Sequence, residues 1–437
     1  MIDEHTLLTI SYRCLLDLAT EEGINASGKD EIFGCIFGRD SAITILKILK
    51  TLNNTHSASY VDLNPLKHIS RTALLTLTRL QGKEVNIESG EEPGKFIHEF
   101  RKDKYEHLVQ QPTPWYLYSD NTLRNYDSLD STPLALIVMY KYWQTTHDEE
   151  FLQSVLPAVE SGLNWMLLYG DRDRDELVEY ELIKTRTYGG LAVQSWTDSI
   201  ESILKKNGSM PLYPIAPVEV QGYVWLAYKL WADFYTSRSA ENPSYIKLAE
   251  DLVIKSANLK RRFNETFIMK SKGLCYPVQA LDGRKKQIKT ITGNPLLLLW
   301  ASYTNNGACE TILEKSLVHD LVQRAFLPDM FDPDAGIRTM STHSQTYNPG
   351  QDSYHNGSFW PKLNGMAHEG LELWEYHKEA QQLKNASLKP LLYFGSPIEL
   401  YVKGIDNPYE EYKNQSGQIS CRYQAWSAAA ALDLLTA

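Results

Sequence analysis

Apolar residues recur with the spacing of an amphipathic helix along most of this 437-residue chain. In residues 39–53 (RDSAITILKILKTLN), Ile43, Leu46 and Leu49 fall on one broad face. The same spacing predicts helices over residues 5–20, 67–81, 131–145, 149–169, 219–236, 243–262, 295–304, 309–325, 358–376 and 423–436, and a shorter one near 377–386. Strand-like alternation is rare, and residues 177–183 (LVEYELI) are a short example between helices. The pattern therefore predicts an all-α fold.

Long segments without this period alternate with short connections. They cover residues 82–126, 170–218, 326–357 and 387–422. Loops of that length are usually functional, so their alternation predicts that one face of the fold is elaborated. No low-complexity linker divides the chain, and we predict a single domain over residues 1–437. Helices in sequential pairs can close into a double ring, although periodicity alone does not establish closure.

Composition narrows the partners and the compartment. The net charge is -10 and no basic stripe occurs, which argues against a nucleic-acid partner. The 26 Tyr and 10 Trp suit stacking against sugar rings, but large helical cores also use aromatic residues.

The five cysteines are scattered without C-x-x-C spacing, so no metal site is predicted and reduced thiols fit a cytoplasmic protein. We see no signal peptide and no apolar run of about 18 residues, and expect no membrane partner. Oligomeric state is left open.

One carboxylate lies in an aromatic string within the longest loop. In QSWTDS (194–199), Asp198 follows Trp196 by two residues. An indole beside a carboxyl group desolvates it and raises its pKa, as a general acid requires. The alternative is a helix cap, because Asp198 and Ser199 precede ESILKK and would cap a short helix there. Taken alone, the string favours the cap.

Two helix starts carry further polar candidates. In IFGRDSAIT (36–44), Arg39 and Asp40 could hold vicinal sugar hydroxyls, or Asp40 could simply favour the helix dipole with Arg39 as its ion-pair neighbour. Both interpretations stay open. Glu219 and Gln221 open an apolar helix in APVEVQGYVWLA (216–227) and either cap it or face a pocket.

The C-terminal third contains the remaining candidates. The run YHNGSFWP (354–361) includes His355, although a lone histidine in such a run is more often a structural hydrogen-bonding residue than a catalyst. Glu399 lies in the apolar string SPIELYVKG (396–404). Glu410 and Glu411, in NPYEEY (407–412), look like ordinary surface acids.

Together these strings resemble the amylo-α-1,6-glucosidase domain of glycogen-debranching enzymes, within the glucoamylase-like six-hairpin glycosidases. FGRDSAI is similar to the family's G-R-D-[ST], EPGKFIHEFR (92–101) to its E-P-G-K-x-x-H-E-x-R, and DSLDSTPL (127–134) to its D-A-T-P-L. QSWTDS resembles Q-x-W-x-D, PVEVQGY resembles P-V-E-x-Q, and SPIELY with QAWSAAA resembles P-E-L-[FT] with Q-A-W-S-A. TGNPLLLLW, GIRTMS and YHNGSFWP resemble further motifs. The matches occur in order over about residues 33–432.

The resemblance implies an (α/α)6 barrel with long functional loops on one face. It further implies an inverting, exo-acting glycoside hydrolase that releases a terminal sugar, expected to be glucose, from an α-linked oligosaccharide or small α-glucoside. Asp198 would be the general acid and Glu399 the base, with no metal or organic cofactor. Arg39 and Asp40 would grip the terminal sugar. The other expected substrate-binding residues are Asp130, Trp115, Trp196, Glu219, Gln221, Arg338, His355, Trp360, Gln424 and Trp426.

Two departures from the family pattern keep alternatives open. Ile398 stands between Pro397 and Glu399, whereas the family has Pro directly before Glu. Trehalase-like enzymes carry their base in an E-x-Y string, which Glu410 and Tyr412 would match, so Glu410 is the alternative base. The chain also begins almost directly at the barrel, which favours a small oligosaccharide or glucoside over glycogen. A sugar epimerase on the same barrel and a catalytically silent sugar-binding or regulatory protein are the rival functions.

Overall fold

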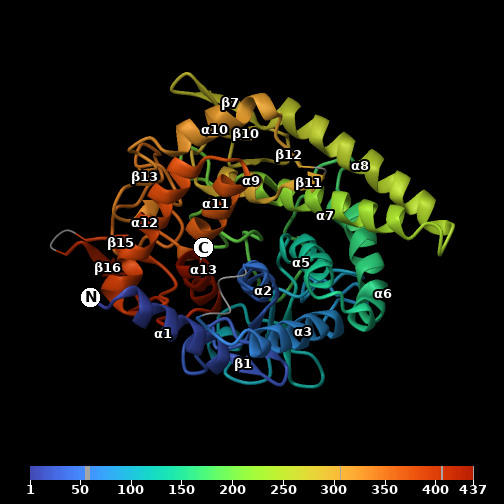
Figure 1. Ribbon diagram of the computed structural model, residues 1–437, viewed down its shortest axis with the longest axis horizontal. Coiled ribbons are helices and arrows are strands. Elements are labelled where there is room, and N and C mark those ends of the chain that lie inside the picture. The colour runs from blue at the N-terminus through green and yellow to red at the C-terminus, as the bar shows by residue number, and fades with distance from the viewer. Residues whose placement is uncertain (55–59, 306, 405–406, 437) are drawn as a thin grey trace.

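The computed structural model describes residues 1–54, 60–305, 307–404 and 407–436. Within them, six helices form an inner ring: α2 (Gly38–Asn53), α5 (Ser131–Thr146), α7 (Val218–Ser237), α9 (Leu297–Trp300), α11 (Pro361–Leu373) and α13 (Ala425–Thr436). Each packs against the next, and α13 packs against α2, so the ring closes (Figure 1). The predicted (α/α)6 barrel is confirmed.

A second set of helices surrounds this ring. It consists of α3 (Asn64–Arg79), α6 (Glu149–Trp165), α8 (Ser244–Thr266), α10 (Val318–Ala325), α12 (His377–Phe394) and α1 (Glu4–Asp17). Most outer helices pack on the inner helix that precedes them. The first helix of the chain, α1, packs on the last, α13, and thereby completes the sixth hairpin.

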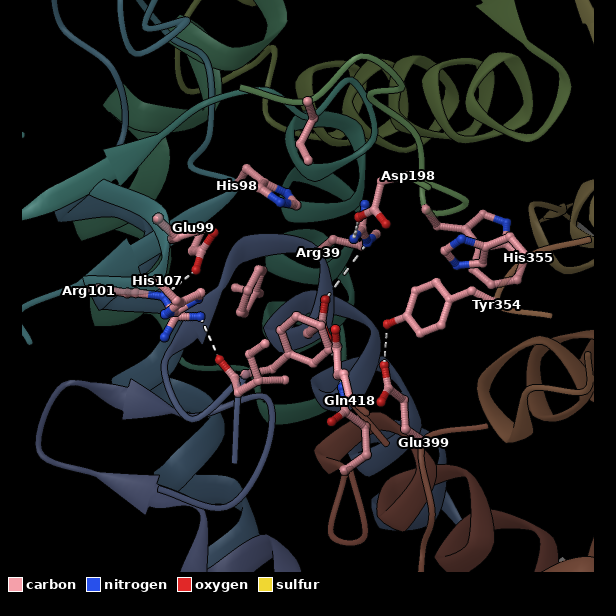
Figure 2. Close-up of a pocket in the computed structure, with 18 of the residues that line it drawn as sticks. Arg39, His98, Glu99, Arg101, His107, Asp198, Tyr354, His355, Glu399 and Gln418 are labelled. Carbon is pink, nitrogen blue, oxygen red and sulfur yellow. Dashed lines mark hydrogen bonds and ion pairs between the residues drawn. The ribbon is translucent and has the colours of Figure 1, made fainter. Parts of the chain in front are cut away.

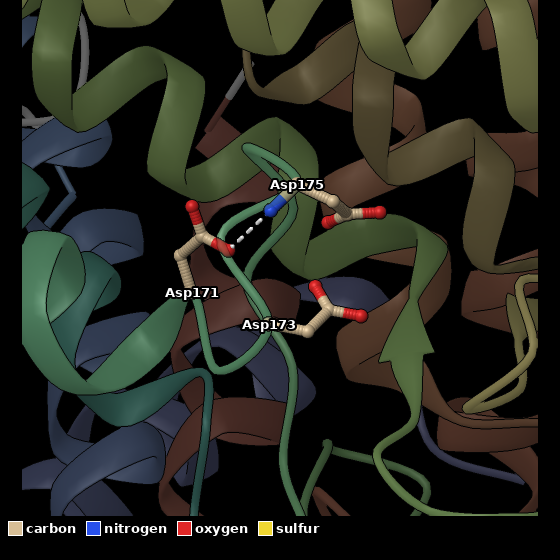
Figure 3. A group of neighbouring side chains, drawn as sticks. All are labelled: Asp171, Asp173 and Asp175. Carbon is tan, nitrogen blue, oxygen red and sulfur yellow. Dashed lines mark hydrogen bonds between the residues drawn. The ribbon is translucent and has the colours of Figure 1, made fainter.

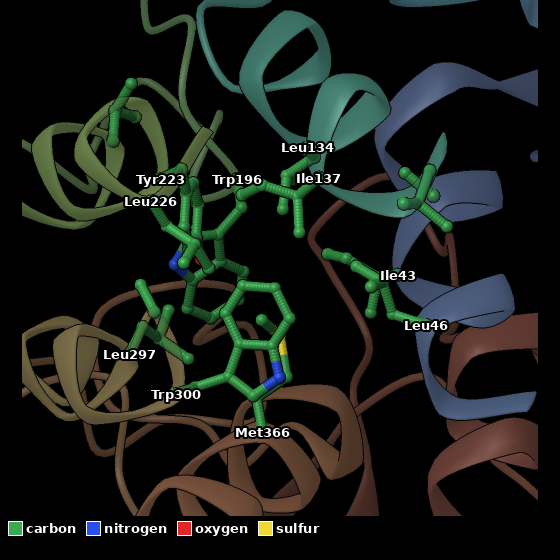
Figure 4. Packing of buried hydrophobic residues seen from close by; sticks show 14 of the residues in the cluster. Ile43, Leu46, Leu134, Ile137, Trp196, Tyr223, Leu226, Leu297, Trp300 and Met366 are labelled. Carbon is green, nitrogen blue, oxygen red and sulfur yellow. The ribbon is translucent and has the colours of Figure 1, made fainter. Parts of the chain in front are cut away.

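The two rings differ in how their side chains are buried. The inner helix α7 is buried on nearly all sides, whereas α8 buries only Ala249, Leu252, Ser256, Leu259 and Phe263, at spacings of three and four residues. A helix that is apolar all round belongs in a core, and a single apolar stripe belongs on a core's surface. Side chains from α2, α5, α7, α9 and α11 meet in the middle of the ring (Figure 4).

An ion cluster ties three inner helices together. The ammonium of Lys47, on α2, donates to the carbonyl oxygen of Gly365 at 2.8 Å, to Glu369 Oε2 at 2.7 Å and to Asp433 Oδ2 at 2.9 Å. Its side chain is 1% exposed, so the two carboxylates balance the positive charge of the ammonium where little water reaches it. The cluster links α2, α11 and α13 at the point where the ring closes.

Several predicted helix boundaries are wrong. The helix expected over 295–304 ends at Trp300, because Tyr303–Asn305 is a strand. The helix expected over 309–325 begins only at Val318, after a turn at Lys315–Leu317, because Ala308–Glu310 is β12, which pairs with β11 (Tyr303–Asn305). Gly307 has a φ of +78° in that hairpin, a conformation that favours glycine. The short helix near 377–386 instead runs to Phe394 and ends where Gly395 adopts a φ of +65°. Residues 177–183 form no strand beyond an isolated bridge from Tyr180.

The long loops all lead into inner helices, so they lie at one end of the barrel and confirm the predicted elaborated face. They contain α4 (Glu106–Val109), a π-helical turn at Met166–Gly170, a 3-10 turn at Asn294–Leu296 and small antiparallel sheets. These sheets are β1–β2 (Ala19–Thr20, Gly23–Ile24), β3–β4–β5 (Ile36–Phe37, Glu99–Arg101, Leu123–Asn125), β10–β9–β6 (Gln287–Ile288, Ala280–Leu281, Ala216–Pro217), β7–β8 (Ile268–Ser271, Leu274–Pro277), β13–β14 (Phe331–Asp332, Gly336–Ile337) and β15–β16 (Tyr401–Lys403, Tyr409–Glu411). None of the helices in the described ranges is long and apolar enough to cross a membrane.

Candidate active site

A cavity of about 510 Å³ opens at the loop-bearing end of the ring (Figure 2). Its walls come from the first turn of α2 and from the segments that precede α5, α7, α11 and α13. The polar and aromatic lining residues include Arg39, Asp40, His98, Glu99, Arg101, His107, Trp115, Trp196, Asp198, Tyr354, His355, Trp360, Glu399, Gln418, Gln424 and Trp426. Segments far apart in the sequence therefore meet around one space.

Asp198 enters this cavity next to Arg39. Its Oδ2 accepts a hydrogen bond from Arg39 Nη2 at 2.8 Å. Burial raises the pKa of Asp198 above its ordinary value, and the charge and hydrogen bond of Arg39 oppose that rise. Residues 199–206 form turns and no helix, so the alternative prediction that Asp198 caps a short helix is wrong.

Arg39 and Asp40 occupy the first turn of α2 and also line the cavity, so a place at the helix start does not keep them from a ligand. Asp40 Oδ2 accepts from Gln424 Nε2 at 3.2 Å, and its Oδ1 lies 3.7 Å from Arg39 Nε without a hydrogen bond in the described structure. Burial raises the pKa of Asp40 to about 7, against the attraction of Arg39. A buried carboxylate oxygen thus lacks a donor where a ligand can supply one.

Glu399 lies in the cavity near Tyr354 and away from Asp198 (Figure 2). Its Oε1 accepts from the Tyr354 hydroxyl at 2.6 Å and its Oε2 from the backbone N–H of Cys421 at 2.9 Å. Burial raises the pKa of Glu399 to about 7, while these two donors favour the ionised form. Glu410 is on β16, paired with Val402 of β15, and does not line the cavity.

Aromatic rings form one wall. The ring of His355 stacks on Trp360 with centroids 4.8 Å apart, and Trp196 meets both edge-on at 5.4 and 5.7 Å. Trp426 meets Trp360 at 5.9 Å, again edge-on. Burial holds the pKa of His355 well below its usual range, so its imidazole is neutral. Its Nδ1 lies 2.9 Å from Ser199 Oγ, and its buried Nε2 has no partner in the described structure.

Two predicted substrate-binding residues lie behind the cavity wall. Asp130 is fully buried and 3.5 Å from Arg39 Nη1. Glu219 is also fully buried and accepts from Asn294 Nδ2 at 3.2 Å, while Asn294 Oδ1 accepts from the indole N–H of Trp196 at 3.1 Å. Neither lines the cavity. Their contacts position Arg39 and Trp196, which do.

Gln221 and Arg338 are also outside the cavity lining. The amide of Gln221 accepts from the backbone N–H of Val178 at 3.0 Å and donates to its carbonyl at 2.7 Å, so it anchors the loop that carries Val178. Arg338 pairs with Asp332 at 3.1 Å and covers the ring of Phe359 at 4.6 Å. The amide of Gln221 is thus occupied by protein partners, whereas the buried Nε of Arg338 has no hydrogen-bond partner among the described residues.

Glu99 and Arg101 line the cavity but were not singled out from the sequence. They lie on β4, where Arg101 Nε donates to Glu99 Oε1 and Arg101 Nη2 to the carbonyl of Ile32 at 2.7 Å. They fall within EPGKFIHEFR, so that string marked the region without marking these side chains. Tyr354, the partner of Glu399, falls within YHNGSFWP in the same way.

Lys362 is a buried cation that no sequence signal indicated, because a lysine at the start of a helix is usually exposed. Its ammonium sits 3.9 Å from the ring centroid of Trp196 and 5.7 Å from that of Trp426. It makes no hydrogen bond within the described residues. Burial lowers the pKa of Lys362 to about 7.

A group of acidic residues lies in the loop before α7, where Asp171, Asp173 and Asp175 bring carboxylate oxygens within 4.8 Å of one another (Figure 3). Oxygen-rich groups of this kind suit hard cations. Here the ammonium of Lys285 meets Asp173 at 2.9 Å, Asp175 at 3.1 Å and the buried Glu179 at 2.7 Å. A lysine therefore compensates much of the group's charge.

A closed ring of six helical hairpins with acidic side chains facing one cavity defines a glycoside hydrolase of the six-hairpin type. The chain belongs to the amylo-alpha-1,6-glucosidase family, whose model matches residues 113–433. It is thus a glycoside hydrolase, as the sequence predicted. No curated protein matches the chain.

Solved structures share the fold at low sequence identity. A GH63 mannosylglycerate hydrolase from Thermus thermophilus in complex with Tris superposes with a TM-score of 0.62 and 14% identity, over 98% of this chain and 99% of that one. Its complex with glucose gives 0.63 and 15% over the same shares. A wild-type glycosidase gives 0.57 and 12%, over 99% of this chain and 95% of that one. At these identities the likeness supports the fold.

Proposed function

We propose that the chain is an inverting, exo-acting hydrolase that releases a terminal sugar, glucose by expectation, from a small α-linked oligosaccharide or α-glucoside. One observation carries the proposal: Asp198 and Glu399 face one cavity from different loops, and burial raises the pKa of Asp198. Glycoside hydrolysis needs a carboxyl group that stays protonated near neutral pH and a second that accepts a proton.

Asp198 protonates the glycosidic oxygen in this mechanism. The guanidinium of Arg39 faces Asp198, Asp40 and Asp130 at 2.8, 3.7 and 3.5 Å. Burial raises the pKa of Asp198 and of Asp40 against the charge of Arg39, so these carboxyl groups favour holding a proton. Of the three, Asp198 has the most exposed side chain, at 23%, and is best placed to deliver that proton to a ligand.

Glu399 removes a proton from the attacking water on the opposite face of the sugar. Tyr354 and the backbone of Cys421 each donate to one of its oxygens, which fixes the carboxylate plane and leaves further lone pairs for water. An inverting geometry requires a separation of roughly 6.5–9.5 Å between the two carboxyl groups, enough for that water.

The size and lining of the cavity support a small substrate. A volume of about 510 Å³ falls within the roughly 300–1,000 Å³ of small-ligand sites. Asp40, Arg39 and Gln424 offer charged and amide groups to sugar hydroxyls, and the indoles of Trp196 and Trp360 offer apolar surface. The relatives of the same fold, a mannosylglycerate hydrolase and its complex with glucose, also favour a small sugar ligand.

A matched pair of variants tests the base. Glu399→Gln should abolish turnover on every member of a disaccharide panel, activated or not, because water attack fails for all of them. Glu410→Gln removes the same charge from the β-hairpin outside the cavity and should leave turnover close to that of the parent. An exchange of the two phenotypes would assign the base to Glu410.

Proton NMR of the first product tests the stereochemistry. An inverting enzyme releases the β-anomer from an α-linked substrate before mutarotation. Early appearance of the α-anomer would require a covalent glycosyl-enzyme and would overturn the inverting mechanism.

A further inference from the structure

A second cavity, of about 450 Å³, shares no lining residue with the proposed active site. Five of its lining residues carry a permanent positive charge: Lys205, Lys206, Lys272, Lys289 and Arg324. No aspartate or glutamate lines it in the part of the chain that the structure describes. The whole chain has a net charge of -10, so this concentration of cations runs against the charge of the molecule.

Three of these cations are uncompensated. Arg324 pairs with Asp329 at 2.7 Å, and Lys272 reaches the same carboxylate at 3.2 Å. By contrast, the ammonium groups of Lys205, Lys206 and Lys289 have no ion pair or hydrogen bond among the residues with described positions. Each ammonium has three donors and no acceptor capacity, so the cavity offers positive charge to an anion.

A tight turn holds two of the free lysines in place. The backbone N–H of Lys205 donates to the carbonyl of Ser209 at 2.9 Å, and Gly208 donates back to the carbonyl of Lys205 at 2.8 Å. Gly208 has a φ of +79°, which suits glycine at such a turn. The backbone of Lys205 and Lys206 is therefore part of a hydrogen-bonded turn, and Lys289 belongs to the segment that follows β10.

The rest of the lining is rich in hydroxyl and amide groups. The hydroxyls of Thr290 and Ser344 and the amide of Gln345 have no hydrogen-bond partner within the described ranges. Ser271 and Thr346 add two more hydroxyls, and Ile288 and Ile291 add a small apolar surface. Groups of this kind, which both donate and accept, match a polyhydroxylated ligand.

We propose that this cavity is a second ligand site and that it takes a phosphorylated sugar. The lysines would meet the phosphate through charge-assisted hydrogen bonds, and the hydroxyl and amide groups would meet the sugar. The volume of about 450 Å³ lies within the range of small-molecule sites. The site is independent of the proposed hydrolysis, although part of its wall belongs to the loops that also carry Asp198 and His355.

Calorimetric titration of the intact chain tests the proposal, with glucose 6-phosphate, inorganic phosphate and glucose as probes. The sugar phosphate should bind more tightly than inorganic phosphate, and its affinity should fall as salt rises. Saturating glucose should leave that affinity unchanged, because glucose lacks the phosphate and would occupy the other cavity. The double variant Lys205→Gln/Lys289→Gln should weaken binding by about tenfold or more.

Lys247→Gln provides the control. Lys247 is an exposed lysine of α8 outside both cavities, and its replacement removes one surface charge, against two in the double variant, without touching the site. Absence of binding, equal affinity of the double variant and the parent, equal losses in the control, or competition by glucose would each overturn the proposal. Equal affinity for inorganic phosphate would overturn the assignment to a sugar ester. None of these readouts depends on hydrolysis, so failure of the proposed function would leave the result intact.

Discussion

The hydroxyl of Tyr354 stabilises the ionised form of Glu399, so a substitution of Tyr354 can test the ionisation of Glu399. It donates to Glu399 Oε1 at 2.6 Å, in a cavity wall where burial raises the pKa of Glu399 to about 7. Tyr354→Phe removes this donor and keeps a ring that can pack against His355 and Trp360. The ionised form of Glu399 then loses stabilisation, so its pKa should rise further.

The size of the shift follows from the strength of the lost bond. A hydrogen bond to a charged group contributes about 1.5–3 kcal/mol, and one pKa unit corresponds to about 1.4 kcal/mol. The pKa of Glu399 should therefore rise by about one to two units. Because a base must be ionised, the acidic limb of kcat/KM should move to higher pH by the same amount. Activity should fall by about ten- to a hundredfold below the limb and recover above it.

The assay is kcat/KM on an unactivated disaccharide between pH 5 and pH 9. Tyr412→Phe is the matched control, because Tyr412 packs against Tyr354 with ring centroids 4.9 Å apart but makes no hydrogen bond to Glu399 in the described structure. Its profile should overlay that of the parent. If Tyr354→Phe lowers activity equally at every pH, ionisation of Glu399 does not set the acidic limb and its role as base is refuted.

Three further changes test other parts of the molecule. Asp198→Asn should lower kcat by orders of magnitude on unactivated disaccharides and much less on substrates with good leaving groups, which need little protonation; near-normal turnover on both would exclude it as the acid. Asp40→Ala should reduce kcat/KM by about ten- to a hundredfold, yet have little effect on 4-deoxy or 6-deoxy terminal sugars, and equal losses on all would remove Asp40 from the sugar pocket. Lys47→Met should lower the free energy of unfolding in urea by about 3–5 kcal/mol, since Glu369 and Asp433 stay buried without their cation. Adding Glu369→Gln and Asp433→Asn should recover part of that loss, and an unchanged midpoint for Lys47→Met would show that the cluster does not stabilise the ring.

Helix existence was readable from the sequence, whereas ring closure was not. The 3.6-residue period reports which face of a helix is buried, and it located α2, α5 and α7 to within a few residues. The contact between α13 and α2 joins opposite ends of the chain and leaves no local pattern, so only the ordered motifs pointed to it. The period also misled at residues 303–304 and 309–310, because apolar spacing describes burial and a hairpin next to a core satisfies it too.

The site divides in a similar way. The motifs identified Arg39, Asp40, Asp198 and Glu399, which all line one cavity. They could do so because each motif combines several residue types that rarely occur together. The motifs did not distinguish side chains that line the cavity from side chains that lie behind its wall. Gln221 makes three hydrogen bonds to backbone groups, which a sequence pattern cannot reveal.

Lys362 was missed for the opposite reason. Lysines are almost always exposed. A lysine among apolar residues at the start of a helix is therefore expected to have a solvated side chain. Its burial between the indoles of Trp196 and Trp426 depends on three segments that are distant in sequence. A cation–π contact of this kind has no sequence signature.

Electrostatic interaction links the buried groups around Arg39 and explains why Tyr354 is the more specific probe. Burial raises the pKa of Asp40 and of Glu219 to about 7 and lowers that of Lys362 to about 7. Groups that titrate together and interact have pKa values that belong to the set, so a variant at Asp40 shifts several of them at once. Glu399 differs, because its hydrogen-bond donors are a neutral phenol and a backbone N–H and it has no ion pair within the described structure. Removing the phenol changes one carboxyl group directly and the rest only through weaker long-range repulsion. A displaced acidic limb in Tyr354→Phe therefore reports on Glu399 itself, which no substitution around Arg39 can do.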